Sequence, residues 1–91
     1  MPADHDDPRP IWWGWELELS PHLLKRMIDR SFSEVDLRAM MESADYWRED
    51  DEPGRWALSV THDGGRWEVI VEPDWADQVL VVITAYPVDR T

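Results

Sequence analysis

The 91-residue sequence contains no cysteine, only four glycines, and only nine basic residues against twenty acidic ones. The absence of cysteine excludes disulfides and thiolate chemistry. The longest apolar run, VLVVITAY at 79–86, is far shorter than the roughly 20 residues that span a bilayer. The opening MPADHDDPRP has neither the basic nor the apolar region of a signal peptide. We therefore expect a soluble cytoplasmic protein that does not enter a membrane.

The shortage of basic residues leaves a net charge of −11. Phosphate contacts normally depend on Lys and Arg, so this charge disfavours a general nucleic-acid binder, although RNA remains compatible with a locally basic site. The charge favours a basic partner or simple solubility.

Cofactor motifs are also missing. The three histidines, His5, His22 and His62, have no metal-ligand spacing. The DGG at 63–65 is a turn without the context of a phosphate-binding loop. No metal and no cofactor are expected.

Tryptophan, in contrast, is abundant. Seven tryptophans can each bury about 200 Å², which compensates for the modest core of so short a chain. Residues 1–10 carry three prolines and four charges without periodicity, which predicts a disordered tail. Residues 11–91 then form a single domain.

Alternation of apolar and polar residues over 13–19 predicts a strand. Two serine caps with apolar staples follow, at Ser20-Pro21 and at Ser33, and they predict helices over about 20–30 and 34–45. Helical spacing assigns to the core Leu23, Leu24, Met27 and Ile28 of the first helix, and Val35, Leu37, Met40, Met41 and Ala44 of the second.

After WREDDEPG (47–54), which has the composition of an exposed loop, the sequence predicts a three-stranded antiparallel meander. Its strands are 55–62, 66–72 and 79–86, the first two joined by the DGG turn. The fold class is therefore α+β. The last strand is apolar on both faces, and two helices cover only one side of a sheet. This predicts a homodimer or a protein complex through 79–86.

The helix at 20–30 concentrates positive charge in an acidic chain. His22, Arg26 and Arg30 recur every four residues and so follow one edge of the helix beside its apolar face. One interpretation is an anion-binding edge. The other is a scaffold, in which the arginines pair with carboxylates such as Asp29 or Glu34 while their stems cover apolar surface.

Four motifs occur in order: HLLKRMIDR at 22–30, GRW at 54–56, WEVIVEPD at 67–74 and VVITAYP at 81–87. With them the chain resembles the bacterial family called domain of unknown function 4258. That family is similar in layout to the RelE/ParE toxins of toxin–antitoxin systems and to the barnase-like, colicin-like ribonuclease fold.

The resemblance implies an endoribonuclease that needs no metal, in which a ribose 2′-OH attacks the adjacent phosphate. His22 would act as general base or acid, and arginines would hold the phosphate. The implied site comprises His22, Arg26, Arg30, Arg66, Thr84 and Tyr86. The alternative is a non-catalytic module that binds a protein through its acidic surface or its apolar last strand. The residues leave open whether the chain is an enzyme.

Overall fold

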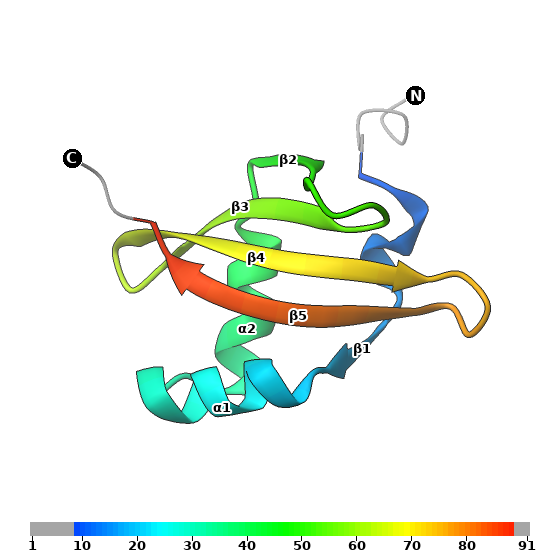
Figure 1. Ribbon diagram of the computed structural model, residues 1–91. Helices are drawn as coiled ribbons and strands as arrows, with labels where there is room; N and C mark the ends of the chain where they lie inside the picture. Colours follow the sequence, from blue (N-terminus) through cyan, green and yellow to red (C-terminus); the bar gives the residue numbers. More distant parts are fainter. Residues whose placement is uncertain (1–8, 89–91) are drawn as a thin grey trace.

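The computed structural model describes residues 9–88, so residues 1–8 of the predicted tail lie outside the described part. The elements are a 3₁₀-helix η2 (Ile11–Gly14), β1 (Glu16–Leu19), α1 (Pro21–Arg30), α2 (Glu34–Glu42), β2 (Tyr46–Glu49), β3 (Trp56–His62), β4 (Gly65–Asp74) and β5 (Val79–Pro87) (Figure 1). The predicted α+β class is confirmed. The predicted first strand is shorter than expected, because η2 occupies its beginning.

The five strands form one mixed sheet in the order β1-β5-β4-β3-β2. β3, β4 and β5 pair antiparallel in succession, as predicted, but as part of a larger mixed sheet. The prediction was incomplete in two respects. β1 joins the sheet parallel to β5, and β2 adds a strand at the far edge.

β2 corrects the assignment of 47–54 to a loop. Tyr46–Glu49 pairs antiparallel with β3, and Trp47 lies opposite Leu58. The polar residues around Trp47 concealed this strand, because an edge strand of four residues shows almost no alternation. What stabilises it is its partner strand, which comes later in the chain.

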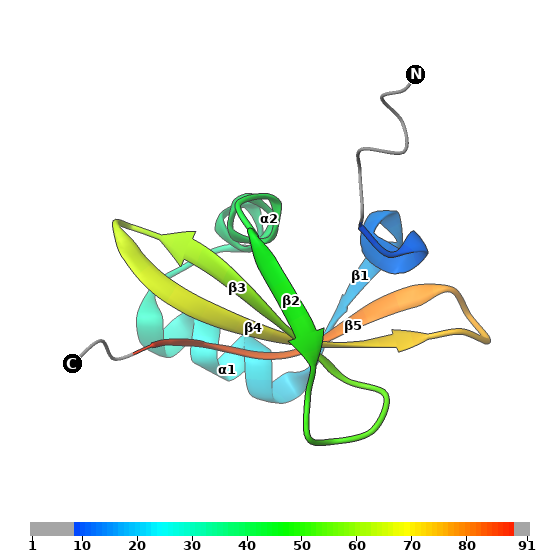
Figure 2. The same ribbon diagram turned by 90° about the horizontal axis from the view of Figure 1, so that it is seen from above.

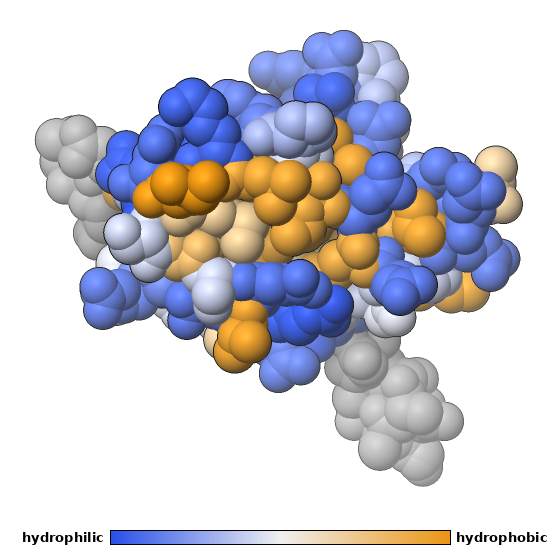
Figure 3. Space-filling view, turned by 90° about the horizontal axis from the view of Figure 1, so that it is seen from below, coloured by the Kyte–Doolittle hydropathy of each residue, from blue (hydrophilic) through white to orange (hydrophobic). Residues whose placement is uncertain are grey.

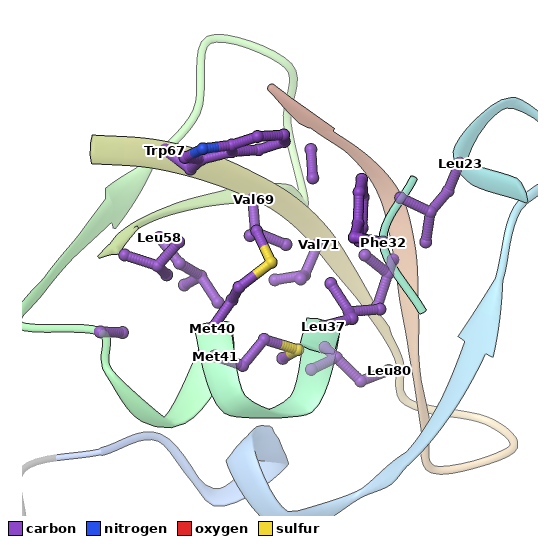
Figure 4. Close-up of a cluster of buried hydrophobic side chains, with 14 of the residues drawn as sticks. Leu23, Phe32, Leu37, Met40, Met41, Leu58, Trp67, Val69, Val71 and Leu80 are labelled. Atoms are coloured by element: carbon purple, nitrogen blue, oxygen red, sulfur yellow. The ribbon is translucent and has the colours of Figure 1, made fainter. Parts of the chain in front are cut away.

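One face of the sheet is covered by α2 and forms the core (Figure 2). Figure 4 shows Leu37 and Met40 of α2 directed toward Val69 and Val71 of β4. Trp12 from η2 is also buried there, with 2% of its surface exposed. Most of the tryptophans thus belong to the hydrophobic core or pack against it. Trp12 and Trp67 are buried in the core, and the partly buried ones that pack against it are Trp13, Trp15, Trp47 and Trp56.

Three residues assigned to the core are exposed instead. Leu24 is 47% exposed, Ile28 79% and Val35 76%. The cause is the position of α1, which lies along β5 at the side of the sheet rather than flat on it (Figure 1). A helix in that position buries one narrow line of residues, of which Leu23 is fully buried.

The second face of the sheet is covered by its own polar side chains. Glu68 accepts hydrogen bonds from Arg48 and Tyr86, and Arg55 pairs with Glu72. Ile70 on this face is only 7% exposed. No large apolar residue of 79–86 is exposed among the described residues, so this strand offers less apolar surface than its sequence suggests.

Ser20 joins β1, β5 and α1. Its N–H donates to the carbonyl of Val82 at 3.1 Å. Its hydroxyl donates to the carbonyl of Ile83 at 2.6 Å and accepts the N–H of Leu23 at 3.0 Å. The pairing of β4 with β5 changes register beside Ile83. One side chain therefore caps the helix and provides a donor to a carbonyl in an irregular stretch of strand.

Replacing Ser20 should therefore lower the free energy of unfolding by more than replacing a serine that only caps a helix. Ser20→Ala removes the cap and leaves the Ile83 carbonyl without this donor, so we expect a loss of about 2–3 kcal/mol in the free energy of unfolding. The control is Ser33→Ala, since Ser33 caps α2 through an exposed capping box and should cost about 1 kcal/mol. Urea denaturation measures both, and equal losses would contradict the role given to Ser20.

Candidate functional site

α1 is held at both ends. Ser20 caps its start, and Ser31 ends it in the left-handed conformation, at φ 59° and ψ 49°. The N–H of Phe32 then donates to the carbonyl of Met27. Between these ends His22, Arg26 and Arg30 lie on successive turns, and we call these three residues the basic edge. His22 and Arg30 are exposed, and Arg26 is half-buried.

The two arginines of the basic edge have no ion-pair partner within residues 9–88. Asp29 pairs with Lys25 at 3.3 Å, and Glu34 pairs with Arg38 at 2.9 Å, so both carboxylates considered as partners are occupied by other residues. The remaining described cations are engaged: Arg48 with Glu68, Arg55 with Glu72, Arg66 with Asp45, and Arg9 with the ring of Trp13 and the carbonyl of Glu42. Arg26 and Arg30 therefore remain available for an external anion.

Arg66 belongs to a different part of the surface. Its guanidinium pairs with Asp45 at 3.2 Å and donates to the hydroxyl of Ser59 on β3. These partners lie on the far side of β4 from β5 and α1. No contact among the described residues brings Arg66 to the basic edge, and its charge is already opposed by the carboxylate of Asp45.

Thr84 and Tyr86 lie on β5, the strand against which α1 packs. They pair with Ile70 and Glu68 of β4, so both side chains lie on the second face of the sheet. The hydroxyl of Thr84 is buried and has no hydrogen-bond partner within the described residues. A buried hydroxyl without a partner is costly and uncommon in folded proteins, which makes Thr84 the most informative member of the predicted set.

Tyr86, by contrast, is already engaged. Its hydroxyl donates to Glu68 Oε1 at 2.7 Å. Burial, together with the hydrogen bond and the negative charge of Glu68, raises the pKa of Tyr86 to about 12. A phenol with this pKa stays protonated at neutral pH, so Tyr86 serves as a donor and not as a base.

A hollow of about 280 Å³ lies elsewhere, between the η2–β1 segment and α2. Its lining comprises Arg9, Trp13, Gly14, Trp15, Leu17, Arg38, Met41 and Glu42. Sequence reasoning did not find it, because it joins residues from two separate segments. The nearest sequence signal is the tryptophan cluster at 12–15. Both arginines of the lining already have contacts within the domain.

No group of three or more His, Asp or Glu side chains suited to a metal ion occurs within residues 9–88. In the same part of the chain, no helix has the length and apolar character needed to cross a membrane.

A family described as a domain of unknown function, DUF4258, matches residues 19–87. The chain belongs to the DUF4258 family. No curated protein and no solved structure matches the chain.

The DUF4258 match begins at the residue before Ser20 and ends with β5. It therefore contains the basic edge, Thr84 and Tyr86, and it leaves out η2 with the tryptophans of the hollow. The family description assigns no activity, and the likeness to RelE toxins and barnase-like ribonucleases stays a prediction.

The environment of Tyr86 can be tested by alkaline titration. Because its pKa is raised from 10.0 to about 12, the stability that Tyr86 contributes is present below pH 10 and is lost as the pH rises toward 12. In a Tyr46→Phe background Tyr86 is the only tyrosine, and its ionisation can be followed by absorbance at alkaline pH.

In that background Glu68→Gln should lower the pKa of Tyr86 part of the way toward 10.0, since burial remains. Glu72→Gln is the control, because Glu72 lies on the same face but pairs with Arg55. A parent protein in which Tyr86 ionised near pH 10 would contradict the assigned contact.

Proposed function

We propose that this domain binds RNA phosphate at the basic edge and cleaves the RNA without a metal. The observation that carries the proposal is the state of Arg26 and Arg30. In a chain of net charge −11, the other described cations have a carboxylate, ring or carbonyl partner, and these two do not. Two free guanidinium groups one turn apart on a helix suit a phosphate, because each offers paired N–H donors.

The chemistry assigns a role to each side chain. His22 removes the proton of the 2′-OH while water protonates the leaving 5′-oxygen, or His22 and water act in the opposite roles. The 2′-oxygen bonds to phosphorus, the bond from phosphorus to the 5′-oxygen breaks, and a 2′,3′-cyclic phosphate remains. Arg26 and Arg30 stabilise the charge that develops on the phosphorane.

Thr84 is the second element of the proposed site, on the strand against which α1 packs. Its hydroxyl is buried and has no partner within residues 9–88, so it can donate to a phosphate oxygen only when the side chains that cover it move aside. Tyr86 and Arg66 are less available, because Glu68 and Asp45 hold them. The proposed site therefore consists of the basic edge and Thr84, and it leaves out Tyr86 and Arg66.

Cleavage of a labelled single-stranded RNA in the presence of EDTA tests the reaction. We expect His22→Ala to abolish cleavage while RNA binding remains. RNA with a 2′-deoxy group at the cleavage position should bind and stay intact, because it lacks the nucleophile. If no RNA is bound or cleaved by the parent protein, the proposal is wrong.

Binding to the same RNA tests the arginines. Arg26→Ala and Arg30→Ala should each weaken binding roughly 10-fold or more and reduce the dependence on salt by about one phosphate contact. Lys25→Ala is the matched control, because Lys25 lies on the same helix but pairs with Asp29. The thermal midpoints should stay nearly unchanged, since neither arginine has a structural partner. An equal effect from Lys25→Ala would show that only net charge matters.

The variant Thr84→Val can show whether the Thr84 hydroxyl contributes to RNA cleavage or to the stability of the fold. Valine has nearly the same shape and removes a buried hydroxyl that has no partner, so we expect the protein to keep or slightly raise its free energy of unfolding. Cleavage should nevertheless fall. Chemical denaturation and the RNA assay measure the two effects, and unchanged cleavage would remove Thr84 from the site.

The alternative function is a non-catalytic module that binds a basic protein. The charge favours it, because the residues outside the two helices hold sixteen acids and only five bases. Absence of RNA binding in the experiments above, together with salt-sensitive capture of a basic protein, would favour this alternative.

A further inference from the structure

The two helices expose an apolar surface that the fold does not cover. Leu24 and Ile28 of α1 are 47% and 79% exposed, and Val35 of α2 is 76% exposed. Only residues 31–33 separate the two helices, so Ile28 and Val35 flank one corner. Figure 3 shows an apolar area, bordered by hydrophilic residues, on the side of the molecule where α1 lies. We call Leu24, Ile28 and Val35 the helix face.

The helices also differ in charge from the rest of the chain. α1 contains three basic residues and one acidic one, whereas α2 contains one basic residue and three acidic ones. The pair is therefore neutral, with an excess of two positive charges on α1 and two negative charges on α2. The remaining residues carry the whole net charge of −11.

This distribution restricts how two copies of the chain can meet. Contact through the sheet or the loops brings together surfaces of like charge, which repel. Contact through the helices does not, and it is favourable if α1 of each copy faces α2 of the other. A two-fold interface repeats each contact with the roles exchanged, so once α1 of one copy faces α2 of the other, the second such pair forms as well.

We propose that the domain forms a two-fold dimer through the helix face, with α1 of each copy packed on α2 of the other. Leu24 and Ile28 would contact Val35 of the second copy, and Arg30 would lie near the acidic start of α2 of the second copy. This surface differs from the strand region 79–86 expected from the sequence, because no large apolar residue of that strand is exposed in the described part of the chain. The proposal shares Arg30 with the proposed RNA site, but it is argued from the helix face and the charge of the two helices, so either proposal can fail without the other.

Sedimentation velocity of the full chain over a range of concentrations tests the dimer. Ile28→Glu and Val35→Asp should each raise the dissociation constant about tenfold or more, because each places a charge among apolar side chains. Ile11→Glu is the matched control: Ile11 is 75% exposed on η2, which lies away from α1 in both ribbon views (Figures 1 and 2). It adds the same charge and should leave the dimer intact. Circular dichroism shows whether each variant is folded.

The charge pattern is tested separately. Arg30→Glu and Glu34→Lys should each weaken the dimer, and the double variant should restore part of the loss by exchanging the two charges. A parent that stays monomeric at the highest attainable concentration would overturn the proposal. So would a dimer that Ile28→Glu and Val35→Asp leave unchanged.

Discussion

The hydroxyl of Ser20 is the contact on which the placement of α1 depends. It donates to the carbonyl of Ile83 and accepts the N–H of Leu23, while the backbone N–H of the same residue extends the pairing of β1 with β5. The start of the helix is thereby attached to the strand it follows. Because α1 runs along β5 from this point, one side of the helix faces the sheet and the other sides face solvent. The basic edge and the helix face both result from that geometry.

The acidic residues pair with the arginines of the sheet but not with those of the basic edge. On the second face of the sheet, carboxylates hold arginines in place: Arg48 contacts Glu68, and Arg55 contacts Glu72. The stems of such long side chains shield apolar residues beneath them, which fits the burial of Ile70. On α1 the opposite holds, since Arg26 and Arg30 pair with no carboxylate of residues 9–88. In a chain with more than twice as many acidic as basic residues, two arginines without a carboxylate partner among the described residues are unexpected.

Local signals in the sequence predicted the parts of the fold that depend on local interactions. The caps at Ser20 and Ser33 are properties of three or four neighbouring residues, and both helices begin where these caps predict. β2 was missed because its existence depends on pairing with β3. The burial of Leu24, Ile28 and Val35 was predicted wrongly because a hydrophobic period shows which side of a helix is apolar, but not how much of that side a neighbouring element covers.

The candidate site, too, was predictable where it depends on neighbouring residues and not where it depends on residues far apart in the chain. The four-residue spacing of His22, Arg26 and Arg30 is a property of one helix, so the sequence was sufficient to predict a shared edge. The pairing of Arg66 with Asp45 joins residues 21 positions apart, and no local pattern indicates it. The buried hydroxyl of Thr84 is likewise visible only when the neighbours of β5 are known.

The parallel pairing of β1 with β5 has a consequence for how the chain is made. Ser20 and Ile83 are 63 positions apart, so the contact that anchors α1 cannot form until the ribosome has released nearly the whole domain. The strand β1 and the helix α1 must wait for β5, their partner in the sheet and the strand on which α1 packs. Contacts between residues so distant in the chain also slow folding, because a long loop must close first. The fold of this domain is therefore complete only after β5 has paired with both β1 and β4.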